Sequence, residues 1–328
     1  MGAKLTEADG QTVDATIEMV RQRLGKGPFF WLDLQGLSGG WSELLLQDFG
    51  FHPLAVEDAE HFGQRPKIDE FDRFTFLVIH GARAAPGEPV TDEVHVFYAP
   101  KHVVTVRHPD AQTLDGVRTR LGRHRSAAGS SPAVSVLYLI VDELVDSYFP
   151  VLAQLDDRID ALEDEILKRP TEAQLGELFD MKRTLVSLRK VVTPERDMFA
   201  RLLSGLNLLE GMTAEDERYF RDLYDHLIRI SDLVDAYRDL LTGAMDTHLS
   251  TVSNRLNVVM KQLTIIATVF LPLSWLTGFF GQNFSLLTGN VLSHSWSFWV
   301  LGIGLELAAA VGLVYVFRRR GWLGGPTE

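Results

Sequence analysis

The consecutive residues Gly281, Gln282 and Asn283 near the end of the chain include two carboxamide side chains that suit contact with a metal cation. They follow an apolar stretch, and residues 262–305 contain no Asp, Glu, Lys or Arg. A ring of neutral carboxamide oxygens can hydrogen-bond the water shell of Mg²⁺ without holding the ion as tightly as carboxylates would. In isolation the same residues also fit the C-terminal cap of a helix, with Gly281 leaving the helix and Asn283 completing the turn.

One carboxylate, Glu306, interrupts the second apolar stretch, 296–317. An ionised carboxylate in the middle of a membrane span costs roughly 2.5–3.5 kcal/mol, and protonation reduces that cost. We consider two interpretations. Glu306 is a structural acid bonded to a hydroxyl of the preceding apolar segment, such as that of Thr268 or Thr277, or it is a site that takes up and releases a proton.

Two apolar segments flank the Gly-Gln-Asn sequence, and both are long enough to cross a bilayer. Residues 263–280 form a run of 18 mostly apolar residues, and residues 296–317 form a run of 22. A membrane-spanning helix needs about 20 such residues. We therefore predict a first span over 263–283, an outer loop over 284–295 and a second span over 296–317.

The first span and its lead-in have one face of small and polar side chains. The residues of this face recur every three or four positions and are Asn257, Met260, Leu263, Ala267, Leu271, Ser274, Gly278 and Gly281. The spacing alone does not decide between Leu263 and Thr264. Such faces contact protein or water rather than lipid. Tight helix packing explains the pattern, and the alternative is a pore lining, which requires several copies because one hairpin cannot enclose a channel.

Charge is divided unevenly along the chain. Of the 32 basic and 44 acidic residues, five basic and two acidic ones lie after Ser253, so the first part has a net charge of −15 and the last part +3. The basic residues lie on the outer sides of the two spans, which places both termini in the cytoplasm and the loop between the spans outside. The acidic first part disfavours nucleic acid as a partner and is compatible with cations. The absence of cysteine excludes thiolate metal sites and disulfides, and the N-terminal residues contain no signal peptide.

The first 130 residues have the pattern of an α/β domain. Short β-branched or aromatic runs predict strands over 28–34, 74–80, 93–99 and 102–108. Residues 41–50 predict a short helix that ends at Gly50. The polar stretch 122–132 is the expected boundary of this domain.

Long helices are predicted after that boundary, with antiparallel helices over 131–212 and a stalk helix over 213–262. The apolar stripes that predict them are Leu152, Leu155, Ile159, Leu162 and Ile166, followed by Leu223, Leu227, Ile230, Val234, Tyr237 and Leu241. Pro170 and Pro194 are expected to interrupt the helices. The last helix starts near Thr213 and continues into the first span, about 65 residues and roughly 100 Å long. The apolar stripe of this helix must be covered by neighbouring helices, most simply those of other copies of the chain. Residues 318–328 are predicted to form a basic cytoplasmic tail.

Together these motifs resemble those of the CorA family of divalent-cation channels. The similar segments are 49–79, 217–241 and 253–284, with the closing basic run. The resemblance implies an α+β fold that has a cytoplasmic α/β domain, a long coiled-coil-like stalk helix and two transmembrane helices. It also implies a homopentamer in the cell membrane, with the first span around the pore.

The resemblance implies a selectivity filter made of Gly281, Gln282 and Asn283, in which Asn283 contacts the metal ion. The residues implied to line the pore are Asn257, Met260, Leu263, Ala267, Leu271, Ser274 and Gly278. The filter sequence departs from the family's usual Gly-Met-Asn, because Gln282 replaces the middle residue. The zinc-transporting ZntB branch also varies this position. The outer loop has no acid, and His294 is its only titratable group.

Family channels close when Mg²⁺ bridges neighbouring cytoplasmic domains through acidic residues, and Asp222 matches one of these acids. Its partner is expected in the turn 81–89, where Glu88 is the only acid. Asp222 and Glu88 are therefore candidate regulatory metal ligands. The alternative for Asp222 is a solvated helix residue, or one paired with Arg218 or Arg221.

We expect the chain to mediate passive influx of Mg²⁺, and of Co²⁺ or Ni²⁺, down the membrane potential, with Mg²⁺ also as a regulatory ion. A divalent ion that moves inward across a membrane potential of 100 mV releases about 4.6 kcal/mol of free energy, so no energy-coupling domain is needed. The first alternative is proton-linked Zn²⁺ transport with Glu306 as the proton site. The second is a membrane-anchored scaffold or sensor without flux. The sequence contains no phosphate-binding loop, HExxH motif or catalytic triad order, so we expect no enzyme.

Overall fold

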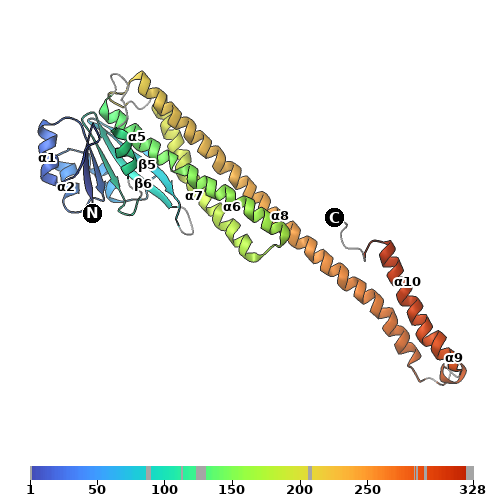
Figure 1. Ribbon diagram of the computed structural model, residues 1–328. Coiled ribbons are helices and arrows are strands. Elements are labelled where there is room, and N and C mark those ends of the chain that lie inside the picture. Colours follow the sequence, from blue (N-terminus) through green and yellow to red (C-terminus); the bar gives the residue numbers. More distant parts are fainter. Residues whose placement is uncertain are drawn as a thin grey trace. The chain divides into compact units, whose positions relative to one another are not determined.

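The computed structural model divides into two units, Met1–Asp246 and Thr247–Glu328, and each is described by itself (Figure 1). The residues that the structure describes are 2–85, 90–111, 114–122, 131–205, 209–283, 285, 287–291 and 294–322.

A seven-stranded sheet with the order β2-β1-β3-β7-β6-β5-β4 forms the first layer of unit 1. Its strands are β1 (Ala3–Glu7), β2 (Thr12–Asp14), β3 (Phe30–Gln35), β4 (Lys67–Phe71), β5 (Phe74–Arg83), β6 (Val90–Ala99) and β7 (His102–Arg107). The pair β3–β7 is parallel, and the other neighbouring strands are antiparallel. The four predicted strands are confirmed as β3, β5, β6 and β7, whereas β1, β2 and β4 were not predicted.

Helices cover both faces of this sheet (Figure 1). They are α1 (Ile17–Lys26), α2 (Trp41–Gln47) and α3 (Pro53–Glu60) over one face, and α4 (Asp115–Leu121) and α5 (Pro132–Asp146) over the other. Successive strand residues point to opposite faces. In β3, Leu32 therefore packs in the cluster under α1–α3, and its neighbour Trp31 packs in the cluster under α5. The short helix predicted to end at Gly50 is α2, and Gly50 has a left-handed φ of +68°.

Three long helices follow in unit 1, and the last of them continues into unit 2. They are α6 (Tyr148–Lys168), α7 (Glu172–Leu203) and α8 (Ala214–Phe280), and α8 has 67 residues. The start of α8 and its continuation into the first apolar segment confirm the predicted uninterrupted helix. Both predicted apolar stripes are buried. The stripe of α8 packs in one cluster with α5, α6 and α7 of the same chain, so the expectation that copies of the chain cover it is wrong for this part of the helix. The helices that cover the apolar stripe of α8 include α6 and α7 of the same chain, which form a hairpin.

The two prolines behave differently. Pro170 separates α6 from α7, and Thr171 begins α7 with a capping box. The interruption expected at Pro194 is wrong, because Pro194 lies inside α7. A proline removes one backbone hydrogen bond from a helix, but the next residue anchors α7 here. Glu195 is buried and accepts a hydrogen bond of 2.9 Å from the backbone amide of His80 in β5.

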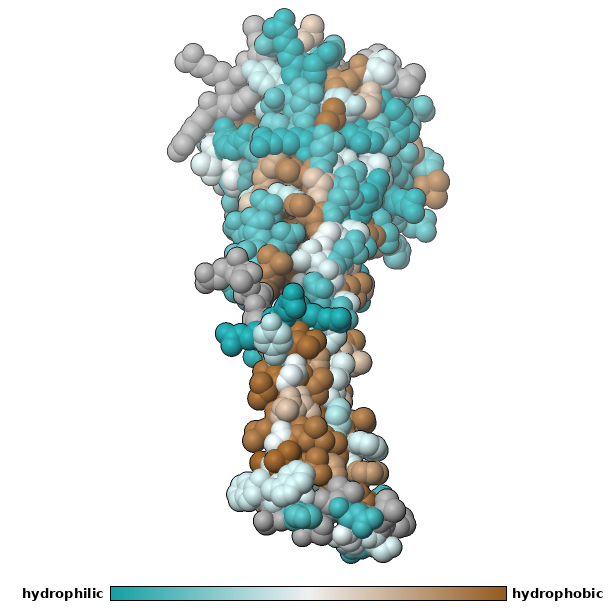
Figure 2. Space-filling model, turned by 90° about the vertical axis from the view of Figure 1, so that its right-hand side faces the viewer, coloured by the Kyte–Doolittle hydropathy of each residue, from teal (hydrophilic) through white to brown (hydrophobic). Residues whose placement is uncertain are grey.

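Unit 2 contains the second part of α8 and the helical segments that follow it. These segments are the π-helix η1 (Leu287–Val291), the short α9 (Ser295–Ser297), the π-helix η2 (Phe298–Gly304) and α10 (Leu305–Arg319). Two helices, over Ala214–Phe280 and Phe298–Arg319, are long and apolar enough to cross a membrane. Figure 2 shows the surface of these spans as mostly hydrophobic, with hydrophilic residues at both ends. The sequence did not predict the π-helical start of the second span.

Candidate functional site

Helix α8 ends directly before the predicted filter sequence. The Gly281 amide donates to the Thr277 carbonyl at 3.0 Å, and the Gln282 amide donates to the Phe279 carbonyl at 3.3 Å. The backbone thus caps the helix. The side chains of Gln282 and Asn283 are exposed and form no hydrogen bond with the described residues. The cap is therefore made by backbone groups and uses neither carboxamide.

The membrane part of α8 has a half-buried face and an exposed face. The residues of the half-buried face recur every three or four positions and are Ile265, Val269, Leu273, Leu276 and Phe280. Lys261 lies one turn before this face, and its Nζ atom donates to the carbonyl of Gly321, two residues after α10, at 3.4 Å.

The residues predicted to line a pore lie outside this half-buried face. Asn257, Met260, Leu263, Ala267, Leu271, Ser274 and Gly278 are all exposed in the single chain. Leu271 is 73% exposed. An apolar side chain that α10 does not cover must meet lipid or another copy of α8. The role of this face in lining a pore stays a prediction.

Glu306 joins the two spans. The Thr277 hydroxyl of α8 donates a hydrogen bond of 2.6 Å to Oε1 of Glu306 in α10. The predicted contact of Glu306 with a hydroxyl of the first span is confirmed, with Thr277 as that hydroxyl rather than Thr268. The role of Glu306 as a proton site stays a prediction.

The candidate regulatory residue Asp222 lies on the surface of α8, and its side chain is 62% exposed. Its Oδ2 atom is 3.9 Å from Nε2 of His226, and Nδ1 of the same imidazole is 3.6 Å from Asp146. Of the alternatives considered for Asp222, the ion pair with Arg218 or Arg221 is wrong, because both arginines pair with glutamates of the preceding turn.

The second candidate regulatory residue, Glu88, lies outside the described residues. Within the described ranges, no group of three or more His, Asp or Glu side chains is arranged to hold a metal ion. A regulatory site built from Asp222 therefore needs ligands from elsewhere, and it stays a prediction.

Sequence analysis did not identify Glu195 of α7. Burial raises its pKa to about 8, against the opposing effect of hydrogen bonds from the His80 amide and the Tyr148 hydroxyl. The sequence held a signal, because Leu188, Val192 and Glu195 recur at helical spacing and the first two are buried. A carboxylate in an apolar stripe of a helix marks a buried polar contact.

The family model described as "CorA-like Mg2+ transporter protein" matches residues 26–319. The cobalt/magnesium transport protein CorA of Thermotoga maritima is 36% identical over 84% of this chain and 78% of its own length. The zinc transport protein ZntB of Yersinia enterocolitica is 27% identical over 79% of this chain and 77% of its own length.

Among solved structures, the CorA magnesium transporter of Methanocaldococcus jannaschii aligns with 98% of this chain and 99% of its own. The TM-score is 0.82 at 23% sequence identity. This likeness concerns the fold, which comprises an α/β unit, a long helix and two C-terminal apolar helices.

Proposed function

This chain belongs to the CorA family of divalent metal-ion transporters, and we propose that five copies of it conduct Mg²⁺ passively into the cytoplasm. The copies place their α8 spans around a common axis. Both termini lie in the cytoplasm, because basic residues flank the outer sides of the two spans. Asn283 then lies at the outer mouth of the pathway.

The observation that supports this proposal most is the charge-free face of α8, together with the carboxamides of Gln282 and Asn283 at its end, which bond to none of the described residues. Residues 262–283 carry no charged side chain, and the predicted lining face stays exposed in the single chain. Around an axis, that face becomes a neutral pore wall. Asn283 offers carboxamide oxygens to the water shell of an entering ion, and Gln282 and Gly281 complete the filter.

Neutral amides suit an ion that must both enter and leave. Mg²⁺ gives up its water reluctantly, so a filter that hydrogen-bonds the hydrated ion avoids the cost of dehydration. The driving force is the membrane potential, about 4.6 kcal/mol for two charges across 100 mV. The acidic first part of the chain, with a net charge of −15, then attracts the ion on the cytoplasmic side.

The test is Mg²⁺ flux into proteoliposomes under a potassium diffusion potential that is negative inside. We expect the initial rate to rise with the potential and to stay unchanged when a pH gradient is imposed. A Mg²⁺ flux that requires the pH gradient contradicts passive conduction, and Zn²⁺ flux without Mg²⁺ flux contradicts the proposed ion.

The second candidate function is proton-linked Zn²⁺ transport, and the contact between Thr277 and Glu306 favours it. The hydrogen bond from Thr277, four residues before Gly281, joins the carboxyl group of Glu306 to α8. A Zn²⁺ flux that rises with an imposed proton gradient, and loses this dependence in the variant Glu306→Gln, supports it over the first proposal.

Regulation by cytosolic Mg²⁺ is the remaining part of the proposal. Asp222 is exposed enough to share an ion with a neighbouring copy, and Glu88 is the expected second ligand. The variant Asp222→Asn should keep conducting when Mg²⁺ inside the liposome is raised, whereas the unchanged protein should slow. Equal slowing of both proteins contradicts the assignment.

A further inference from the structure

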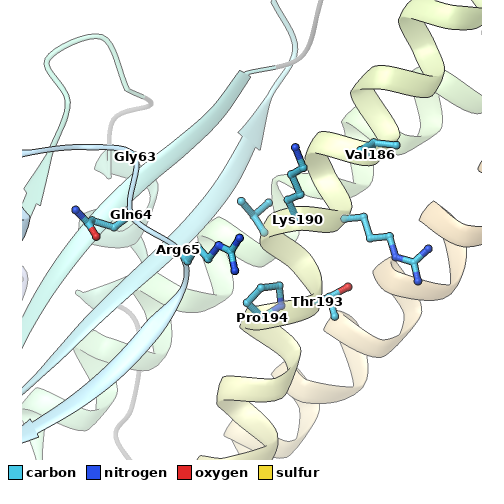
Figure 3. Close-up of a pocket in the computed structure, with 9 residues that line it drawn as sticks. Gly63, Gln64, Arg65, Val186, Lys190, Thr193 and Pro194 are labelled. Carbon is cyan, nitrogen blue, oxygen red and sulfur yellow. The ribbon is translucent and has the colours of Figure 1, made fainter.

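A cavity of about 520 Å³ lies in unit 1 between the loop that follows α3 and the middle of α7. Gly63, Gln64 and Arg65 line the loop side, and residues between 186 and 194 of α7 line the other side (Figure 3). The transport function described above does not use this cavity.

Among the described residues that line the cavity, three have basic side chains and none has an acidic one. Arg65 comes from the loop and extends toward α7 (Figure 3). Arg189 and Lys190 come from α7. Arg65 and Lys190 are exposed and form no ion pair or hydrogen bond through their side chains with the described residues. Like charges around one cavity repel each other, and an anion between them relieves the repulsion.

Buried carboxylates anchor both walls of the cavity. Glu93 of β6 accepts hydrogen bonds from the amides of Gly63, at 2.5 Å, and Gln64, at 3.1 Å, so the loop is tied to the sheet. Glu195 of α7 accepts a hydrogen bond of 2.9 Å from the His80 amide of β5, so α7 is tied to the same sheet. The basic side chains therefore extend from fixed backbone, which lowers the entropy cost of binding a ligand.

The chemistry of the lining selects the ligand class. Val186, Val191 and Pro194 add an apolar wall beside the basic residues. A matching ligand carries at least two negative charges and an apolar ring, and phosphate groups suit the forked guanidinium of arginine. We propose that this cavity binds a nucleotide, with its phosphates between Arg65 and Lys190 and its base against the apolar wall.

The third basic residue links the cavity to α8. Nη1 of Arg189 lies 2.8 Å from Oδ1 of Asp235 in α8, and Nη1 of Arg238 lies 3.7 Å from the same oxygen. A bound polyphosphate would attract Arg189 away from Asp235, and Asp235 would then pair with Arg238 alone. Helix α8 continues into the first span, so this exchange carries nucleotide binding to the pore helix. The regulatory step rests on the proposed function, whereas the binding itself does not.

The test is isothermal titration calorimetry on the full chain in lipid nanodiscs, in Mg²⁺-free buffer. The probes are ATP, inorganic triphosphate and adenosine. ATP should bind more tightly than triphosphate, and adenosine should bind most weakly. Arg65→Gln and Lys190→Gln should each raise the Kd for ATP about tenfold or more, because each removes a charge-assisted hydrogen bond.

Two matched controls lie on α7 outside the cavity, Lys182→Gln and Arg201→Gln, and both should leave the Kd unchanged. Thermal melting of each variant checks that it is folded. Absence of ATP binding by the unchanged protein at millimolar ATP overturns the proposal, as does an unchanged Kd in Arg65→Gln and Lys190→Gln. Equal affinity for triphosphate and ATP overturns the nucleotide assignment. Because binding is measured without transport, its failure leaves the proposed Mg²⁺ flux untouched.

Discussion

The Thr277 hydroxyl of α8 lies 2.6 Å from Oε1 of Glu306 in α10 and 2.9 Å from the carbonyl of Leu273. A hydroxyl has one proton and can donate it fully to only one acceptor. When Glu306 is ionised, Thr277 donates to the carboxylate. When Glu306 is protonated, the acid can donate to Thr277, which then donates to Leu273. The second arrangement joins the two spans without placing a charge in the membrane.

The variant Glu306→Gln should keep Mg²⁺ flux within about twofold of the unchanged protein, because the amide can take the place of the carboxyl group as hydrogen-bond partner of Thr277. Glu306→Leu should lower the melting temperature, because it removes the hydrogen bond between the spans. The measurement is proteoliposome flux above and below neutral pH, with thermal melting in detergent. Loss of flux in Glu306→Gln with normal melting contradicts a purely structural role and favours the proton-linked function.

Replacing Asn283 by alanine should reduce Mg²⁺ uptake about tenfold or more, because every copy loses the carboxamide that contacts the hydrated ion. Uptake in cells that depend on added Mg²⁺ measures the effect. The matched control is Asn290→Ala, which removes an exposed carboxamide from η1 and should leave uptake unchanged. Equal uptake by the two variants argues against a filter at Asn283.

A bulky residue on the predicted lining face should obstruct the pathway. Ser274→Phe should lower Mg²⁺ flux about tenfold or more, because the added ring fills a narrow neutral pore. The adjacent Trp275 lies about 100° further around the helix and is 63% exposed, so Trp275→Phe serves as the control and should keep its flux. Size-exclusion chromatography checks that both variants assemble. If Trp275→Phe is the variant that fails, the lining face has been assigned to the wrong side of α8.

Glu195 makes the stability of the chain depend on pH. Burial raises its pKa to about 8 from the ordinary value of 4.5. The folded protein therefore keeps a proton that the unfolded chain releases, and this contribution to stability falls as pH rises between these two values. Glutamine carries no such proton, so Glu195→Gln should melt at a higher temperature than the unchanged protein near pH 8, and the difference should shrink toward pH 5.

Thermal melting across this pH range measures the difference between the two proteins. Burial also lowers the pKa of His80 to about 4, and that group destabilises the fold as pH falls below 6.5. His80 is present in both proteins, so its effect cancels in the difference. A difference that does not change with pH is incompatible with a protonated Glu195.

Secondary structure was predicted most accurately where apolar residues repeat at one constant spacing along a long segment. Helix α8 was predicted to within a residue at its start, because its apolar stripe continues into an uncharged span without a proline before Pro272. The strands β1, β2 and β4 were missed because they lie toward the edges of the sheet and lack a clean apolar alternation. Every residue of β2, for example, is exposed.

Tertiary contacts account for the other differences. The helix continues through Pro194 because Glu195 anchors α7 to the sheet. That contact joins residues far apart in the sequence, so rules based on neighbouring residues could not predict it. The stripe of α8 is buried by its own chain because the α6–α7 hairpin folds back beside it. The filter assignment of Gly281, Gln282 and Asn283 rests on the family resemblance, because their chemistry alone also fits a helix cap, and it stays a prediction. Their arrangement around an axis depends on neighbouring copies, whose contacts a single chain does not contain.

Electron cryo-microscopy of the assembled protein in nanodiscs with Mg²⁺ tests the central claim most directly. Our account predicts a fivefold axis lined by Leu271, Ser274 and Gly278, with the Asn283 carboxamides around an ion at its outer mouth. An assembly whose Asn283 side chains face lipid, or whose α8 spans enclose no axial path, would contradict it.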